Sequence, residues 1–189
     1  MAQYDLSGLN LYVPDHILTP SIQRMLEKGW YEIEESRALK AHLLDTDTVL
    51  ELGSGIGYLA ALCATVVGAD NVTTVEANPE MIPVIEHNLN RLELGGVKVI
   101  NGVAVETAHS ETEDFYIAEA FWAGTRKKVE GGSQRQISVP SLTLRNLIEE
   151  AHPTILIVDV EGAEDEYFFF DLPGDIRLII IELHPARYP

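Results

Sequence analysis

Two stretches of this sequence combine glycines and carboxylates at the spacing of a ligand site. The first is 49–60, VLELGSGIGYLA, where an apolar run meets Glu51 and gives way to three glycines. The second is 159–164, DVEGAE, which crowds three carboxylates around one glycine. Glycine lets the backbone pass close to a ligand, and crowded carboxylates are costly unless a cation lies among them. These stretches predict a site for a small charged molecule.

The elements that position these stretches alternate between strand and helix patterns. Short apolar runs predict strands at 49–52, 72–75, 97–100, 154–158 and 177–183. Helical spacing or capping signals predict helices at 20–29, 31–44, 56–67, 79–92 and 143–151. This alternation is typical of an α/β, Rossmann-like sandwich with a mostly parallel sheet and helices on both faces.

The length of 189 residues is that of a single domain. We expect residues 1–45 to form an N-terminal helical cover and residues 46–189 to form the ligand-binding core. Residues 1–19 show no clear periodicity. Short strands are expected near 115 and 136, around a loop or lid at about 121–136 that carries Arg126, Lys127 and Lys128, with Arg135 close by. These cations either receive an anionic acceptor or lie on a solvated hairpin tip.

The charge of the chain excludes several classes of partner. Thirty acidic and thirteen basic residues give a formal net charge of −17, which repels nucleic acids and anionic membranes. The single cysteine, Cys63, fits a reducing compartment. The first ten residues lack the pattern of a signal peptide, and no apolar run reaches membrane-spanning length. We therefore expect a cytoplasmic protein that binds neither nucleic acid nor membrane.

The strand ends suggest which ligand is bound. Glu76 ends the second strand, where a carboxylate can accept hydrogen bonds from both hydroxyl groups of a ribose. Ala104 follows the third strand and is expected to border an adenine. The glycines read GSGIG rather than the dinucleotide fingerprint GxGxxG, and no second substrate domain is evident. A nicotinamide-dependent oxidoreductase remains an alternative.

Taken with these motifs, the chain resembles the FkbM-type methyltransferases, which have the class I methyltransferase fold. The matching stretches are GWYEIEE (29–35), VLELGSGIGY (49–58), TTVEANPE (73–80), VKVINGVAV (97–105), VPSLTL (139–144), ILIVDVEGAE (155–164) and IIIELHP (179–185). The resemblance implies S-adenosylmethionine as cofactor and O-methylation of a small-molecule acceptor. The implied cofactor-binding residues are Glu51, Gly53, Ser54, Gly55, Gly57, Glu76, Ala77, Asn78, Ala104 and Asp159.

The expected catalytic residues follow the fourth and fifth predicted strands. His184 is the first candidate for the base that removes an acceptor proton, because its unperturbed pKa lies near neutral pH. Asp159 is expected beside the methionine amino group or the acceptor, and Glu161 in either place. We expect no metal, although a divalent cation held by Asp159, Glu161 and either Glu182 or His184 would also explain the crowding of carboxylates.

The chain departs from the family pattern in places. Arg145 stands in TLR where the family usually has LDD, and the sequence stops at Pro189 without the usual C-terminal antiparallel hairpin. Either the strands near 115 and 136 complete the sheet, or its edge meets another subunit, so that a homodimer is possible. A non-catalytic S-adenosylmethionine-binding module is a further alternative.

Overall fold

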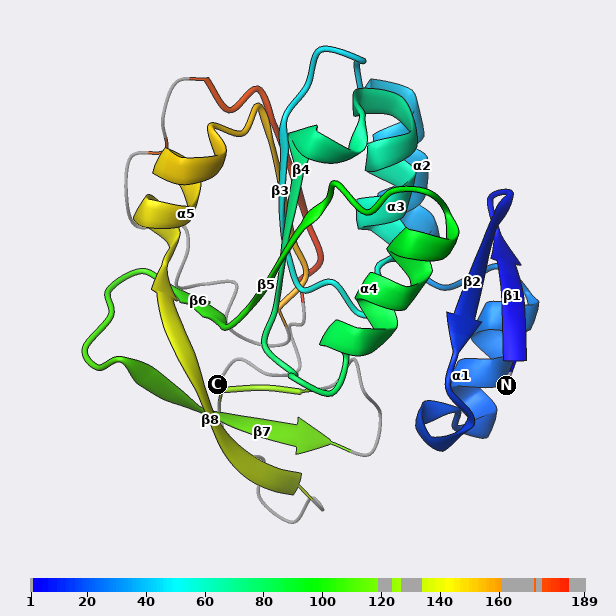
Figure 1. The fold of residues 1–189 in the computed structure, drawn as a ribbon, viewed down its shortest axis with the longest axis horizontal. Coiled ribbons are helices and arrows are strands. Elements are labelled where there is room, and N and C mark those ends of the chain that lie inside the picture. Colours follow the sequence, from blue (N-terminus) through cyan, green and yellow to red (C-terminus); the bar gives the residue numbers. More distant parts are fainter. Residues whose placement is uncertain (1, 119–123, 127–133, 161–171, 173–174, 184–189) are drawn as a thin grey trace.

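A five-stranded parallel sheet forms the centre of the computed structural model, which describes residues 2–118, 124–126, 134–160, 172 and 175–183 (Figure 1). The strands stand in the order β10-β9-β3-β4-β5, and every neighbouring pair is parallel. The order reverses between β3 and β9, and ligands bind at the carboxyl ends of strands beside such a reversal. The strands are β3 (Val49–Leu52), β4 (Val72–Glu76), β5 (Lys98–Asn101), β9 (Ile155–Val158) and β10 (Leu178–Ile181).

In the described part of the chain, helices cover both faces of this sheet (Figure 1). Alternate strand residues divide between the two layers. Val49 and Ile157 pack in the cluster that contains α3, whereas Leu50 and Leu156 pack with α5. The predicted α/β sandwich with a mostly parallel sheet is therefore confirmed. The helices are α2 (Ile33–His42), α3 (Tyr58–Val67) and α4 (Ile82–Arg91) on the first face, and α5 (Leu144–Ala151) on the second.

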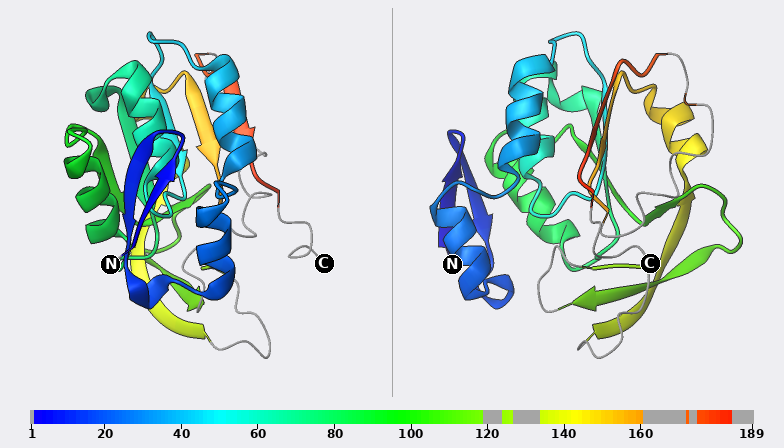
Figure 2. Two further views of the ribbon diagram at one scale, coloured as in Figure 1. Left: turned by 90° about the vertical axis from the view of Figure 1, so that its right-hand side faces the viewer. Right: turned by 180° about the vertical axis from the view of Figure 1, so that it is seen from behind.

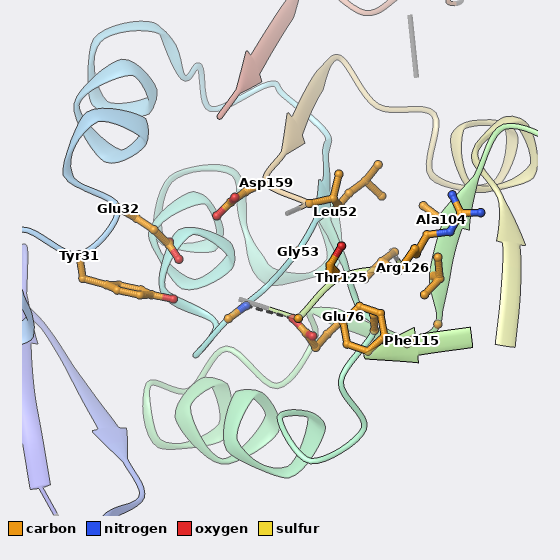
Figure 3. A pocket seen from close by; sticks show the side chains of 17 residues that line it. Tyr31, Glu32, Leu52, Gly53, Glu76, Ala104, Phe115, Thr125, Arg126 and Asp159 are labelled. Carbon is orange, nitrogen blue, oxygen red and sulfur yellow. Dashed lines mark hydrogen bonds between the residues drawn. The ribbon is translucent and has the colours of Figure 1, made fainter. Parts of the chain in front are cut away.

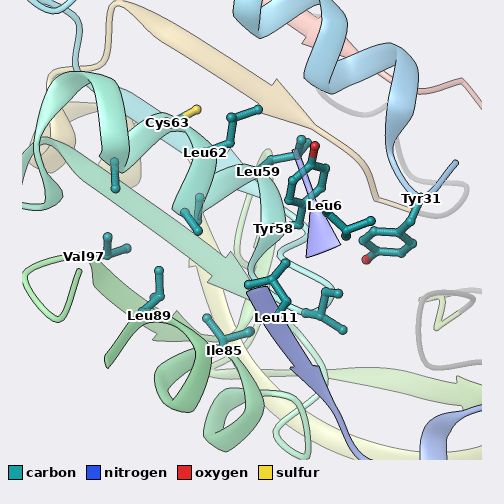
Figure 4. Packing of buried hydrophobic residues seen from close by; sticks show 14 of the residues in the cluster. Leu6, Leu11, Tyr31, Tyr58, Leu59, Leu62, Cys63, Ile85, Leu89 and Val97 are labelled. Atoms are coloured by element: carbon teal, nitrogen blue, oxygen red, sulfur yellow. The ribbon is translucent and has the colours of Figure 1, made fainter. Parts of the chain in front are cut away.

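Helix α3 begins directly after the glycine stretch and is apolar around most of its circumference. Every residue from Tyr58 to Ala64 is buried. The helix contacts β4 of the sheet and, on its other sides, α2 and strand β2 of the N-terminal hairpin. Figure 4 shows these side chains packed together. A helix enclosed in this way holds its N-terminal end, and hence the glycine turn, in a fixed position. The short 3₁₀ helix η2 (Ala69–Asn71) then leads from α3 into β4.

The N-terminal part of the chain differs from the helical cover expected there, because it opens with an antiparallel hairpin. Strands β1 (Ala2–Leu6) and β2 (Leu9–Val13) are joined by Ser7 and Gly8, whose φ values are 57° and 85°. Positive φ at both positions is the mark of a tight two-residue hairpin turn. A 3₁₀ turn, η1 (Asp15–Ile17), and helix α1 (Pro20–Glu27) follow. The hairpin and α1 lie on the outer side of the helical layer (Figure 2).

A buried asparagine of α4 fastens the hairpin to the glycine stretch. The Asn88 amide donates to the backbone carbonyls of Tyr12 (3.0 Å) and Ile56 (2.9 Å), and its Oδ1 accepts the Tyr12 N–H (2.7 Å). Because Asn88 is fully buried, these groups have little access to water as an alternative partner. One side chain therefore connects β2, α4 and the loop before α3.

The strands expected near 115 and 136 exist, but they do not extend the central sheet. They form a separate sheet in the order β6-β8-β7, in which β6 is parallel and β7 antiparallel to β8. The chain leaves the central sheet at Gly102, where a Cβ would lie 2.6 Å from Leu142 Cδ1 and 2.9 Å from the Pro140 carbonyl oxygen. This close approach turns β6 away from β5 and toward β8. The strands are β6 (Val103–Val105), β7 (Thr112–Ala118) and β8 (Gln134–Thr143).

No helix in the described part of the chain is both long enough and apolar enough to cross a membrane.

Candidate functional site

The glycine turn after β3 approaches its neighbours too closely for side chains. Gly53 has φ of 89°, and a Cβ there would lie only 1.9 Å from the carbonyl oxygen of Asp159. Gly55 has φ of 52°, and a Cβ there would lie 2.2 Å from the Tyr31 hydroxyl oxygen. Both positions need glycine for backbone conformation and for space. The turn is therefore held between the end of β9 and the segment before α2.

Glu76 at the end of β4 holds this turn from below. Its Oε2 accepts the N–H groups of Ser54 and Gly55, both at 3.1 Å, and its Oε1 accepts the N–H of Asn78 at 2.7 Å. Figure 3 draws the hydrogen bond from Gly55. Burial raises the pKa of Glu76, and these backbone hydrogen bonds partly oppose the rise. A further backbone hydrogen bond, from Ala77, also lowers this pKa, and the Glu76 side chain lines the pocket.

Glu51 lies beneath the turn, not in the pocket. Its side chain is 1% exposed, and its Oε2 accepts a hydrogen bond from the Thr74 hydroxyl, which is also hydrogen-bonded to the Ser54 hydroxyl. Burial raises the pKa of Glu51 to about 8; the Thr74 hydrogen bond opposes this and the nearby Glu76 adds to it. Glu51 is therefore largely neutral at pH 7 and supports the turn from inside the core.

A single pocket joins the turn to the second sheet, and its two ends differ in chemistry (Figure 3). At one end, Tyr31, Glu32 and Asp159 point toward the glycine turn. At the other end lie Ala104 and the side chain of Phe115, together with Thr125 and Arg126. Glu76 lies between the two ends.

The segment that carries Thr125 and Arg126 pairs with strand β7. Tyr116 and Thr125 exchange backbone hydrogen bonds of 2.8 and 3.1 Å. The Arg126 guanidinium lies 3.5 Å from the Glu113 carboxylate. Arg135, the other described cation of the expected lid, forms an ion pair with Glu80 and does not line the pocket. Lys127 and Lys128 lie outside the described residues.

The expected site residues fall into three groups. Six of the expected residues line the pocket: Gly53, Gly55, Glu76, Ala77, Ala104 and Asp159. Four do not line it: Glu51, Ser54, Gly57 and Asn78. Glu51 and Ser54 support the turn, Gly57 precedes α3, and the Asn78 Oδ1 accepts the N–H of Glu80. Ligand contact by these four residues stays a prediction: the side chains of Glu51, Ser54 and Asn78 are buried, and Gly57 packs against Ile85. Glu161 and His184 lie outside the described residues.

Sequence reasoning missed several residues that line the pocket. Tyr31 and Glu32 precede the central sheet in the chain and were not among the expected site residues. Phe115 was expected in a strand, without a place in the site. Their positions depend on the packing of the N-terminal segment and the second sheet against the core, which no local pattern reveals. The GWYEIEE stretch was the available signal for the first two.

No three His, Cys, Asp or Glu side chains within the described ranges are grouped so as to bind a metal ion. Two of the residues considered for such a site, Glu161 and His184, are not among those ranges. The expectation of no metal, and the alternative of a divalent cation at these carboxylates, therefore both stay predictions.

The pocket fits the parts of S-adenosylmethionine by the chemistry of its donor groups. Carboxylates at one end suit a cationic methionine moiety, and an acid at the end of the second core strand suits a ribose. The apolar wall at the other end, with Phe115 and Ala104, suits an adenine ring.

Comparison with known proteins gives a family-model match and several relatives. A family model described as protein-L-isoaspartate(D-aspartate) O-methyltransferase matches residues 36–108. A protein-L-isoaspartate O-methyltransferase of Methanococcus aeolicus is 44% identical over 61 residues, which are 32% of this chain and 28% of the relative. Its counterpart from Methanococcoides burtonii is 42% identical over 55 residues, covering 29% of this chain and 27% of the relative. The matched parts thus span less than a third of these relatives.

These matches support a class I methyltransferase that uses S-adenosylmethionine as methyl donor. They agree with the cofactor expected from the sequence. They do not single out the FkbM-type family. The matched segment runs from α2 through β6, so it includes Gly53, Glu76 and Ala104 but ends before Phe115 and Asp159.

Proposed function

We propose that this chain is an S-adenosylmethionine-dependent methyltransferase that methylates a hydroxyl oxygen of a small-molecule acceptor. The observation that carries this proposal is the order of groups along the pocket: carboxylates, then Glu76, then an apolar end. The cofactor has its cationic methionine part, ribose and adenine in the same order. A nicotinamide dinucleotide would instead bring two phosphates toward Glu32 and Asp159, which would repel them.

When bound, S-adenosylmethionine supplies an activated methyl group on a sulfonium sulfur. The acceptor oxygen forms a bond to the methyl carbon as the carbon–sulfur bond breaks, and the electron pair stays on sulfur. The glycine turn and Glu76 hold the donor in place, since alignment of the reactants can remove about 7–11 kcal/mol of the barrier. The hydroxyl proton must pass to a base, and we propose the imidazole of His184, with Asp159 and Glu161 nearby.

The small-molecule acceptor is favoured by where the matches end. The isoaspartate family model stops at residue 108, before the second sheet and the ends of β9 and β10. The stretches in that later part, VPSLTL, ILIVDVEGAE and IIIELHP, resemble FkbM-type methyltransferases. We therefore assign the acceptor side of the site to that family, whose members mostly methylate small molecules.

A second candidate is methylation of isoaspartyl residues in proteins, the activity named for the matched relatives. An isoaspartyl carboxylate arrives already ionised and needs no base. It would, however, have to approach Glu32, Asp159 and a chain with a net charge of −17. Like charges at short range disfavour that acceptor relative to a neutral hydroxyl.

The test is release of S-adenosylhomocysteine from S-adenosylmethionine by the purified protein. One series offers sugars and other small hydroxyl compounds, and a second offers an isoaspartyl peptide beside its ordinary aspartyl counterpart. Turnover with hydroxyl compounds alone supports the proposal. Turnover with the isoaspartyl peptide alone moves the function to the second candidate. Cofactor binding without turnover in either series favours a non-catalytic binding module.

A further inference from the structure

The segment between α1 and α2 reaches the glycine turn and forms one wall of the pocket. Tyr31 is 5% exposed, and its hydroxyl oxygen lies 2.2 Å from the place that a Cβ on Gly55 would occupy. The Glu32 Oε1 lies 3.3 Å from the same point. The bare α-carbon of Gly55 is therefore covered by two polar atoms that come from outside the Rossmann-like core.

The side chain of Glu32 points toward the pocket and does not cap the helix that follows it. It is the residue before α2, with φ of 47° and ψ of 39°, and its carboxylate makes no capping hydrogen bond to the helix. A residue at this position commonly accepts a hydrogen bond from the first turn of the helix. Here the carboxylate points toward the space above the glycine turn, and Asp159 points toward the same space from β9 (Figure 3).

This end of the pocket is strongly acidic. Burial raises the pKa of Glu32 well above its ordinary value, and the charge of Asp159 raises it further, while a hydrogen bond with Tyr31 opposes the rise. Arg126 is the one lysine or arginine among the described residues that line the pocket, and it lies at the opposite end. A cation brought by a ligand would relieve the repulsion between the two carboxylates.

We propose that Glu32, positioned by Tyr31, binds the ammonium group of the methionine part of the cofactor. An ammonium group has three hydrogen-bond donors, whereas a sulfonium has none, so the oxygens beside Gly55 match the ammonium. This assignment rests on the proposed function, because it names a residue of the same cofactor site.

Two ligands separate binding of the ammonium from binding of the rest of the cofactor. S-Adenosylhomocysteine carries the ammonium and carboxylate, and 5′-methylthioadenosine keeps the adenosine and the thioether but lacks both. We would measure both dissociation constants by calorimetry for the natural protein, Glu32→Gln and Glu34→Gln. Glu34 is the matched control, because its side chain is 74% exposed and pairs with Arg37.

The expected result is a loss of about 10-fold to 100-fold in S-adenosylhomocysteine affinity for Glu32→Gln, the effect of one charged hydrogen bond. Binding of 5′-methylthioadenosine should change by less than about 2-fold, and Glu34→Gln should change neither constant. Tyr31→Phe, which keeps the ring, should weaken S-adenosylhomocysteine selectively by a few fold.

The outcomes distinguish the two levels of the proposal. Equal weakening of both ligands by Glu32→Gln, or no weakening of either, overturns the role of Glu32 while leaving the cofactor site intact. Failure of the folded natural protein to bind S-adenosylhomocysteine or S-adenosylmethionine overturns the proposed function, and the role of Glu32 with it. Unfolding midpoints in denaturant verify that each variant is folded.

Discussion

Gly53 lies close to the end of β9, and adding a single methyl group at Gly53 tests whether the site depends on this close packing. Gly53→Ala would place a Cβ 1.9 Å from the Asp159 carbonyl oxygen and 2.9 Å from its carbon. Both neighbours are backbone atoms of the parallel sheet, so no side chain can turn aside to make room. Gly8→Ala is a matched control, because Gly8 has φ of 85° against 89° at Gly53 and no atom lies within 4 Å of its Cβ position.

The expected magnitudes follow from these two environments. Alanine at positive φ costs about 1–2 kcal/mol, which should be the whole effect of Gly8→Ala. At Gly53 the same cost applies, and crowding in a packed region adds about 1–3 kcal/mol. Moving Asp159 away also strains the 2.9 Å hydrogen bond from its N–H to the Leu52 carbonyl. We expect Gly53→Ala to destabilise the fold by about 2–5 kcal/mol in total.

Urea unfolding of the two variants measures this difference, and calorimetry with S-adenosylmethionine measures its consequence for the pocket. Gly53→Ala should unfold at clearly lower urea than Gly8→Ala and should bind the cofactor at least about 10-fold more weakly. Equal stability of the two variants would refute the reasoning, because the backbone conformation alone would then account for the effect.

Three further predictions concern the groups around the turn. Asn88→Ala removes the buried side chain that joins β2, α4 and the loop before α3. It should lower the free energy of unfolding by about 3–5 kcal/mol, since two carbonyls and one N–H lose their partner. A difference of less than about 1 kcal/mol in urea unfolding would contradict this. Glu51 has a folded-state pKa raised to about 8, so its contribution to stability is complete below pH 4.5 and is lost as pH rises through 8. Glu51→Gln should therefore remove part of the decline in stability between pH 5 and 8. Parallel profiles of stability against pH for the natural protein and the variant would argue against this role of Glu51. Burial raises the pKa of Asp47, but hydrogen bonds from Arg177, the Leu44 N–H and Thr154 bring the net pKa below its ordinary value. The stability that depends on Asp47 should therefore be lost as pH falls below about 4. Asp47→Asn should weaken this acid sensitivity without changing cofactor affinity, because the pocket lies at the other end of the strands.

The central architecture could be predicted from the sequence because its signals are local. The apolar runs at 49–52 and 154–158 lie in strands β3 and β9, and the acidic strand end at Glu76 lines the pocket. A buried parallel strand is nearly continuous in apolar residues, and this pattern depends little on distant contacts. The fold class and the part of the site formed by β3 and β4 could therefore be predicted from the sequence.

The N-terminal hairpin was missed for a different reason. Tyr4, Leu6, Leu11 and Val13 alternate with polar residues and are buried, so a period of two was present. Each strand has only five residues, and the pattern is broken by the turn at 7–8. Runs this short carry too few repeats to separate a strand from an irregular segment.

The part of the site that could not be predicted is formed by long-range packing. The Tyr31 hydroxyl lies against Gly55, far from it in the sequence, and Phe115 lines the pocket from β7 of the second sheet. Glu51 stands beside the glycines in the sequence, but its side chain is 1% exposed and is hydrogen-bonded to Thr74 beneath the turn. Neighbours in sequence were a poor guide to neighbours in the site.

The most direct test of the account is calorimetric binding of S-adenosylmethionine and of NAD to the natural protein, Glu76→Ala and Glu80→Ala. Glu80 is the control acid, because it is exposed and pairs with Arg135 outside the pocket. The account predicts binding of S-adenosylmethionine but not NAD, a loss of at least about 10-fold for Glu76→Ala, and no loss for Glu80→Ala. Failure of the folded natural protein to bind S-adenosylmethionine, or binding that Glu76→Ala leaves unchanged, would contradict it.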